Sequence, residues 1–211
     1  MDKLVFQAIN VYNTFMFTCI LLCGGSSRRF GSPKVLATLD GETVVQRLQK
    51  MLLKTQVDEI ITVLGAHATR IKPHLLKHKT IKLVHNKDYK FGQTSSFRAG
   101  LRCASQNTRG ILLLPVDYPL IREDTINRLI DFYKENSPLI LIPTFEGQKG
   151  HPPLFSNRLR GDFLALDNNS GLNSIAHIYE TQTKLLPVSD RGVVQTFNTQ
   201  KEFEALKRYD G

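Results

Sequence analysis

The segment at residues 19–34 most constrains the fold of this chain, because an apolar run changes there into a glycine-rich, cationic loop. The apolar residues that end at Cys23 predict a buried strand, and glycines allow the backbone to approach an anion closely. Backbone N–H groups of such a loop, together with Arg29 and Lys34, are suited to neutralising phosphate oxygens. The segment therefore predicts a strand that leads into a phosphate-binding turn, with a nucleoside triphosphate as the ligand.

The spacing of the glycines excludes two common phosphate loops. A Walker loop places four residues between its glycines and continues with Gly-Lys and Ser or Thr. Here Gly25 and Gly31 enclose five residues and are followed by Ser32 and Pro33. The sequence also contains no G-x-G-x-x-G motif, so the dinucleotide-binding fingerprint is absent.

The same segment resembles the signature of the MobA/MocA-like nucleotidyltransferases, which is approximately L-A-(A/G)-G-x-S-x-R-x-G-x-x-K. The matching positions, with the cysteine in the small-residue position, are Leu22, Cys23, Gly24, Gly25, Ser27, Arg29, Gly31 and Lys34. The resemblance implies that these residues bind the nucleotide, and that the two basic residues stabilise charge on its triphosphate. A solvated basic loop after a buried strand is the alternative interpretation.

Past the loop, helical and strand patterns alternate, as a mostly parallel, doubly wound sheet requires. Apolar residues recur at helical spacing within residues 43–55, and β-branched residues at 59–64 predict a strand. The other expected elements are helices at 68–77, 94–103 and 124–136, the last capped by Asp124, and strands at 81–85, 111–116 and 139–143. We predict a single-domain α/β protein with a Rossmann-like, three-layer fold, and the resemblance implies the GT-A nucleotidyltransferase type.

A length of 211 residues suits one domain better than two. We expect the nucleotidyltransferase domain at residues 16–211, with a nucleotide-binding part at about 16–120 and an acceptor-side part at about 121–211. Relatives in the resembled family usually start shortly before the first strand, and Met16 lies where such a start would fall. We therefore expect residues 1–15 to be a disordered extension or the product of a misplaced start codon.

The composition narrows the choice of partner and compartment. A net charge of +9 suits a polyphosphate ligand, whereas scattered basic residues without interleaved aromatic residues argue against nucleic-acid binding. The apolar stretch within residues 11–23 is too short to span a bilayer, so we expect no membrane association. The three cysteines, Cys19, Cys23 and Cys103, show neither disulfide nor zinc-site spacing, which favours the reducing cytoplasm.

A metal site is expected after the strand at 111–116, where Asp117 begins a loop. Ligands of open α/β sheets bind outside the carboxyl ends of the strands, and a carboxylate there can hold a divalent cation against phosphate oxygens. Asp117 and Pro119 match the D-x-P of the resembled family, which implies that Asp117 binds Mg²⁺; a turn or capping aspartate is the alternative. Asn198 and Thr199 match part of the family's N-x-N-T-P-E-D element, which implies a second ligand, and a helix cap is the alternative role for Asn198.

Two further segments match the family. Residues 92–101 resemble its G-x-x-S-S-x-x-x-G-L stretch, which implies that Ser95 and Ser96 border the nucleotide base; capping of a helix is the alternative. Residues 147–155 resemble its G-x-x-G-H-P loop on the acceptor side, and a later G-x-N element follows. The acceptor-binding residues implied by these matches are Gly150, His151, Pro152 and Asn173. A purely structural role is the alternative for the histidine.

The resemblance implies a nucleotidyltransferase that uses Mg²⁺. In the family's reaction, a phosphate of the acceptor attacks the α-phosphorus of a nucleoside triphosphate and pyrophosphate leaves. No protein nucleophile is needed, and the implied catalytic residues are Arg29, Lys34 and Asp117. The serine pair and the 150–152 match favour CTP, whereas residues 23–25 and the match at Asn198 favour GTP.

Molybdopterin is the acceptor that the resemblance implies, and a molybdoenzyme or its chaperone is the implied partner. Three alternatives stay open. They are transfer to a sugar phosphate, a GT-A-like glycosyltransferase, and a non-catalytic nucleotide-binding accessory protein. A glycosyltransferase would offer D-x-D at the metal site, where this chain has Asp117-Tyr118-Pro119. Departures from the family element at Thr196, Gln200 and Lys201 favour the accessory protein.

Overall fold

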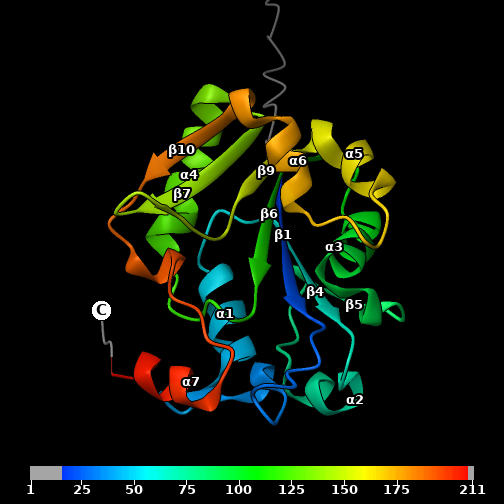
Figure 1. The fold of residues 1–211 in the computed structure, drawn as a ribbon, viewed down its shortest axis with the longest axis vertical. Coiled ribbons are helices and arrows are strands. Elements are labelled where there is room, and N and C mark those ends of the chain that lie inside the picture. Colours follow the sequence, from blue (N-terminus) through cyan, green and yellow to red (C-terminus); the bar gives the residue numbers. More distant parts are fainter. Residues whose placement is uncertain (1–15, 209–211) are drawn as a thin grey trace, which may run out of the picture.

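The computed structural model describes residues 16–208. The expected N-terminal extension, residues 1–15, lies outside the described residues. One mixed, mostly parallel sheet forms the centre of the molecule (Figure 1), with the strand order β10-β7-β9-β6-β1-β4-β5 and with β8 paired to β7. Its strands are β1 (Met16–Cys23), β4 (Glu59–Leu64), β5 (Ile81–His85), β6 (Thr108–Pro115), β7 (Ile140–Phe145), β8 (Gln148–Lys149), β9 (Leu154–Ser156) and β10 (Thr183–Pro187). Two short strands, β2 (Thr38–Leu39) and β3 (Glu42–Thr43), form a separate hairpin.

Parallel pairing dominates the sheet. The strand β9 runs antiparallel to both β6 and β7, and β8 runs antiparallel to β7. The pairs β1–β4, β1–β6, β4–β5 and β7–β10 are parallel. The prediction of a mostly parallel α/β sheet is therefore confirmed.

Helices cover both faces of the sheet, which gives the expected three layers (Figure 1). They are α1 (Val44–Leu52), α2 (Ala68–Ile71), α3 (Gly92–Cys103), α4 (Glu123–Asn136), α5 (Arg160–Ala165), α6 (Asn173–Ile178) and α7 (Gln200–Leu206). Side chains of α1, α4 and α7 pack into one hydrophobic core, and those of α3, α5 and α6 pack into another. Alternate residues of β1 serve the two cores, since Leu21 belongs to the first and Ile20 to the second. This alternation explains why the strand is apolar almost throughout.

Two expected helices differ from the structure. The helix expected at 68–77 ends early, because α2 stops at Ile71 and a 3-10 turn containing Pro73 follows. The assignment of Asp124 as a cap is wrong, since α4 begins at Glu123 and Asp124 lies inside its first turn. The buried carboxylate of Asp190 takes the capping role instead, by accepting hydrogen bonds from the Arg122 N–H (2.9 Å) and the Thr125 hydroxyl (2.7 Å).

The parallel pairing brings three strand ends to one edge of the sheet. The strands β1, β4 and β6 run in the same direction, so the loops that follow Cys23, Leu64 and Pro115 are neighbours (Figure 1). The Val116 N–H donates to the Leu22 carbonyl at 3.1 Å, which continues the pairing past the end of β6. The glycine-rich loop and Asp117 therefore start side by side. Within residues 16–208, no helix has the length and apolar character that a bilayer crossing requires.

Candidate active site

Ser27 organises the glycine-rich loop from within. Its backbone adopts a positive φ of 51°, and its carbonyl accepts hydrogen bonds from the N–H groups of Phe30 (3.0 Å) and Gly31 (3.2 Å). Its hydroxyl accepts a hydrogen bond from the Lys34 N–H at 3.1 Å. These bonds fold the loop into a compact turn and fix the backbone from which the Lys34 side chain extends.

The start of the loop packs closely against the loop that follows β4. The Gly24 carbonyl accepts a hydrogen bond from the Ala66 N–H at 3.0 Å. A Cβ atom added to Gly24 would lie 3.2 Å from the Ser96 hydroxyl and 3.3 Å from the Gly65 nitrogen. The glycine at this position therefore permits an approach of two loops and one helix that a side chain would crowd.

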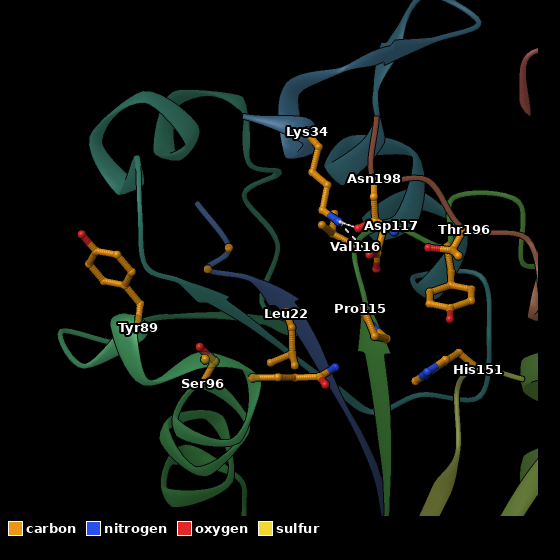
Figure 2. A pocket seen from close by; sticks show the side chains of 15 residues that line it. Leu22, Lys34, Tyr89, Ser96, Pro115, Val116, Asp117, His151, Thr196 and Asn198 are labelled. Atoms are coloured by element: carbon orange, nitrogen blue, oxygen red, sulfur yellow. Dashed lines mark hydrogen bonds and ion pairs between the residues drawn. The ribbon is translucent and has the colours of Figure 1, made fainter. Parts of the chain in front are cut away.

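The Lys34 ammonium group joins three segments that lie far apart in the sequence (Figure 2). It donates to Asp117 Oδ2 at 2.7 Å, and Asn198 Oδ1 and the Phe197 carbonyl each lie 3.4 Å from it. The Lys34 and Asp117 side chains are only 15% and 18% exposed. The structure thus brings together three residues that the sequence assigned to phosphate and metal binding.

Asn198 reaches this position through the start of α7. The Glu202 carboxylate accepts hydrogen bonds from the N–H groups of Asn198 (2.6 Å) and Thr199 (3.2 Å), and the Thr199 hydroxyl accepts one from the Glu202 N–H. Thr199 is therefore the N-cap residue, and the capping role considered for Asn198 is wrong. The Asn198 side chain instead faces Lys34 and Asp117 (Figure 2).

Aromatic packing holds the same segment against the glycine-rich loop. The buried Phe30 ring lies 5.5 Å from the Phe197 ring and 5.8 Å from the Phe203 ring, both in edge-to-face geometry. Phe30 belongs to the loop, Phe197 directly precedes Asn198, and Phe203 lies within α7. This cluster explains how the last part of the chain is fixed beside Lys34.

The oxygen atoms at this point fit a divalent cation that is shared with a phosphate ligand. Asp117 and Asn198 offer a carboxylate oxygen and an amide oxygen, and both already surround a positive charge, that of Lys34. Among the described residues, no group of three or more His, Cys, Asp or Glu side chains is placed to hold a metal. Two hard oxygen ligands suffice for Mg²⁺, because its remaining ligands are usually phosphate oxygens and water.

A cavity of about 420 Å³ opens beside these groups (Figure 2). The predicted site residues that line it are Leu22, Gly24, Gly25, Lys34, Ser96, Asp117, His151 and Asn198. Other predicted residues lie outside its lining. Arg29 and Gly31 are exposed, Ser27 shapes the loop, and Cys23 is buried behind it. Burial raises the pKa of the Cys23 thiol above its ordinary range, so this thiol stays protonated and belongs to the core.

The two predicted base-binding serines differ in position. Ser96 lines the cavity, whereas Ser95 does not. The Ser95 hydroxyl bonds to the carbonyls of Asp88 and Gly92, both at 2.9 Å. The buried Asn86 amide donates to both serine hydroxyls, at 3.0 Å and 3.1 Å. Asn86 and Ser95 therefore fix the start of α3, and Ser96 alone of the pair faces the ligand space.

A second cavity, of about 750 Å³, lies beside the first and shares lining residues with it. The predicted residues Gly150, His151 and Asn173 line it, whereas Pro152 is buried outside its lining. Its lining combines apolar side chains such as Phe155 with uncharged polar groups of the 168–173 segment and with the charged residues Lys149 and Glu180. The structure therefore places most of the predicted acceptor-binding residues around this second cavity.

His151 is held rigidly between the two cavities, since it lines both. Its N–H donates to the Val193 carbonyl at 2.8 Å, and its ring centroid lies 4.5 Å from that of Tyr118. A Cβ atom on Gly150 would lie 2.5 Å from the Val193 carbonyl oxygen, so only glycine permits this approach. Burial lowers the pKa of the His151 ring below its ordinary value.

Several cavity residues were missed in the sequence. The first cavity is also lined by Tyr89, Gln93, Tyr118 and Thr196, and Gln93 lines the second cavity too. Tyr118 directly follows Asp117 and Gln93 directly precedes the predicted helix, so adjacency to a motif was the available signal. Tyr89 carried no such signal, because its position depends on the contact between its loop and Gly65.

Comparison with protein families decides the assignment. The family model described as the MobA-like NTP transferase domain matches residues 19–184 of the chain. The chain belongs to the MobA-like NTP transferase family. The resemblance found in the sequence is confirmed, and the membership supports a nucleotidyltransferase enzyme.

Curated relatives of this MobA-like NTP transferase differ in their names. A probable UDP-N-acetylglucosamine pyrophosphorylase of Acanthamoeba polyphaga mimivirus is 28% identical over 160 residues, which are 74% of this chain. The match covers only 59% of the viral protein's length. The purine catabolism protein PucB of Bacillus subtilis is 23% identical over 199 residues, which cover 90% of this chain and 95% of PucB.

Solved structures support the fold. Rv0371c of Mycobacterium tuberculosis superimposes with a TM-score of 0.81 at 23% identity, covering 92% of this chain and 99% of Rv0371c. A second structure of Rv0371c, in complex with manganese, has a TM-score of 0.75 over 90% of this chain and 97% of that one. At this identity the likeness shows the fold alone.

Proposed function

We propose that this protein is a magnesium-dependent nucleotidyltransferase that transfers a nucleoside monophosphate, from CTP by preference, to a phosphorylated acceptor such as molybdopterin, with release of pyrophosphate. The observation that carries the proposal is the convergence of Lys34, Asp117 and Asn198 at the wall of a cavity that begins with the glycine-rich loop. Family membership supports the reaction class. The nucleotide, the metal and the acceptor are our proposals.

The chain's own residues would act by alignment and charge neutralisation. Gly24 and Gly25 line the cavity where the triphosphate would lie, and Lys34 extends into it. An acceptor phosphate oxygen would form a bond to the α-phosphorus while the bond from that phosphorus to the β-phosphate breaks, so that pyrophosphate leaves. Lys34 would stabilise the negative charge on the phosphates during this exchange, and Arg29 would act from the outer side of the loop. No protein side chain forms a covalent bond.

Asp117 and Asn198 would hold Mg²⁺ through their side-chain oxygens. When bound, Mg²⁺ supplies positive charge to the phosphate oxygens and to the departing pyrophosphate. Glu202 would position this ligand without contacting the metal, because its carboxylate accepts a hydrogen bond from the Asn198 N–H. Lys34 lies within hydrogen-bonding distance of both proposed ligands, so it also orients them.

The preference for CTP rests on the sequence matches at Ser95, Ser96 and 150–152, and Ser96 lines the nucleotide cavity. Guanylyl transfer is the related alternative. A sugar-phosphate acceptor is the second candidate, because the mimivirus relative is named a probable UDP-N-acetylglucosamine pyrophosphorylase. A molybdoenzyme or chaperone partner and a cytoplasmic location stay predictions.

Pyrophosphate release tests the proposal. The purified protein would be incubated with Mg²⁺, with CTP, GTP, ATP or UTP in turn, and with molybdopterin or N-acetylglucosamine 1-phosphate as the acceptor. We expect release with CTP and molybdopterin, and its loss in Asp117→Ala. The matched control is Asp131→Ala, which alters an exposed aspartate on α4.

Each outcome separates one alternative. Release with UTP and the sugar phosphate only would replace our acceptor by the second candidate, and release with GTP would replace our nucleotide. Release that persists in Asp117→Ala would remove Asp117 from the mechanism. Nucleotide binding without turnover on either acceptor would favour the accessory protein.

A further inference from the structure

The segment between α5 and α6, residues 167–172, forms one wall of the second cavity, which its last five residues line. It contains neither helix nor strand. Asp167 Oδ1 accepts hydrogen bonds from the N–H groups of Asn169 (2.7 Å) and Ser170 (2.9 Å), which gives the segment a turn of its own. The buried Leu172 anchors its last residue in the core that α3, α5 and α6 share. The middle of the wall needs support from elsewhere.

That support comes from α3, which covers the same face of the sheet as α5 and α6 (Figure 1). The Thr94 hydroxyl donates to the Ser170 carbonyl at 2.7 Å, and the Arg98 guanidinium donates to the Asn168 side chain at 3.2 Å. Within residues 16–208, the other hydrogen bonds that leave the segment go to Ser174 on the adjoining α6. The Arg98 bond is exposed to water, whereas Thr94 is buried. Thr94 is therefore the firmer of the two links.

The Thr94 hydroxyl serves this distant segment and not its own helix. A threonine at a helix start commonly accepts a hydrogen bond from a backbone N–H of the first turn. Thr94 instead donates to a carbonyl that lies 76 positions further along the chain. The start of α3 is held by Ser95, which bonds to the carbonyls of Asp88 and Gly92, and by Asn86. Removal of the Thr94 hydroxyl should therefore release the wall and leave the helix in place.

The first turn of α3 borders both cavities. Ser96 lines the first cavity, Thr94 lines the second, and Gln93 lines both. In the reaction proposed above, on which this inference rests, the phosphate of the acceptor substrate must reach the α-phosphorus of the nucleotide. Such a reaction depends on the alignment of the two substrates. A cavity wall that is fixed to this turn keeps the second cavity in a constant position relative to the first.

We propose that Thr94 is a positioning residue for the acceptor substrate. Its hydroxyl holds the wall at 167–172 in the form that binds the part of this substrate beyond the reacting phosphate. The uncharged polar residues of the wall suit hydroxyl, amide or ring N–H groups, so the substrate class is a phosphorylated compound that carries such groups.

Two substitutions isolate the hydroxyl. Thr94→Val removes it and keeps the branched shape of the side chain, whereas Thr94→Ser keeps it. We expect Thr94→Val to raise the KM for molybdopterin roughly 2- to 10-fold, the range that loss of one hydrogen bond gives, with the KM for CTP unchanged. Thr94→Ser should stay close to wild type. The matched control is Thr69→Val, at an exposed threonine of α2 that lines neither cavity.

The link itself can be tested in the ligand-free protein by heteronuclear NOE measurements on the backbone amides of residues 168–172. We expect values typical of ordered backbone in wild type, a fall in Thr94→Val and recovery in Thr94→Ser. A raised KM with unchanged amide order would mean that the hydroxyl contacts the substrate directly, which overturns the positioning role. Reduced amide order with an unchanged KM would overturn it too, because the substrate would not depend on this wall.

Failure of this inference can be distinguished from failure of the proposed reaction. Either of the two overturning results, obtained with turnover, leaves the nucleotidyltransferase standing. In the absence of turnover, molybdopterin or N-acetylglucosamine 1-phosphate would be added while the same amide signals are followed. Signals that shift in wild type, and that need a higher concentration to shift in Thr94→Val, would support the wall and overturn the proposed reaction. Signals that do not move with either compound, together with no turnover, would overturn both.

Discussion

At the scale of single residues, Lys34 combines two tasks that its surroundings make inseparable. Its ammonium group neutralises the mostly buried Asp117 carboxylate, and it lines the cavity in which we place the triphosphate. Lysine suits both tasks because its charge is compact and its stem is flexible. The ammonium can therefore contact a phosphate without leaving the neighbourhood of the carboxylate.

Replacement of this lysine should abolish transfer and weaken the fold. We expect Lys34→Met to lower the transfer rate about 100- to 1,000-fold, the usual cost of removing one group that stabilises developing charge. The free energy of unfolding should fall by roughly 1–3 kcal/mol, because the Asp117 carboxylate loses its partner. Pyrophosphate release and urea unfolding measure the two effects. Lys50→Met, which alters an exposed ion pair with Glu42, is the control, and equal activity in both variants would contradict the role of Lys34.

At the scale of elements, the end of one helix positions a proposed metal ligand. The capping box of α7 uses the Glu202 carboxylate to hold the N–H groups of both Thr199 and Asn198. The backbone of Asn198 is therefore fixed before any metal arrives. Outer partners of this kind commonly affect metal affinity as well as local stability.

Removal of the capping carboxylate should weaken metal binding. We expect Glu202→Ala to lower the apparent affinity for Mg²⁺ about 10-fold or more, as for other residues that support a metal ligand. Titration of pyrophosphate release with Mg²⁺ provides the measurement. Glu204→Ala removes an exposed carboxylate from the same helix and serves as the control. If Glu202→Ala and Glu204→Ala gave identical magnesium titrations, the role of Asn198 as a metal ligand would be contradicted.

The buried Glu59 on β4 connects this strand to β1, to the loop after α3 and to β5. Its carboxylate accepts bonds from the Thr18 hydroxyl (2.8 Å) and the Ser105 N–H (3.1 Å), and it pairs with Lys82 on the edge strand β5. Burial would raise the pKa of Glu59, but the bonds from Lys82, Ser105 and Thr18 outweigh it and hold the pKa below 4.5. The ionised form is therefore the one that the folded state favours.

The sign of the pH effect follows from this lowered pKa. The stabilisation by Glu59 is complete above the pKa of the unfolded chain and is lost as the pH falls through the folded pKa. We expect Glu59→Gln to lower the free energy of unfolding by roughly 1–3 kcal/mol at pH 7, and the difference from wild type to shrink below pH about 4.5. Urea unfolding across this range measures it. Glu135→Gln, at an exposed position of α4, should show no such pH dependence, and a constant difference for Glu59→Gln would refute the assignment.

At the scale of the whole molecule, the features predicted correctly from the sequence are those that parallel strand pairing brings together. The glycine-rich loop and Asp117 each follow an apolar strand, and adjacent parallel strands bring such loops to one edge. Asn198 was predicted from a partial motif, and its position beside Lys34 depends on packing of three phenylalanines from distant segments. The cap of α4 was wrong because Asp190, far along the chain, replaces the local residue. Tyr89 lines the cavity because its loop packs against Gly65, a tertiary contact that leaves no local pattern in the sequence.

Nucleotide binding should stabilise the whole fold, because the proposed ligand contacts loops from both halves of the chain. A ligand at 100 times its Kd adds about 2.7 kcal/mol to the free energy of unfolding, which for a chain of this size raises Tm by roughly 5–11 °C. We expect this rise with CTP and Mg²⁺, a smaller one with GTP, and little with ATP or UTP. Thermal unfolding at a fixed concentration of each nucleotide measures the preference without any acceptor.

The same experiment in Lys34→Met shows whether stabilisation arises at the glycine-rich loop. The rise in Tm with CTP should disappear in Lys34→Met and persist in Lys50→Met, because Lys34 lines the cavity in which we place the nucleotide and Lys50 does not. Equal shifts with all four nucleotides would mean that the triphosphate is bound and the base is not selected, so Ser96 would have no role in recognition. A shift that survives in Lys34→Met would place the nucleotide elsewhere on this basic chain, and the convergence of Lys34, Asp117 and Asn198 would then need another explanation.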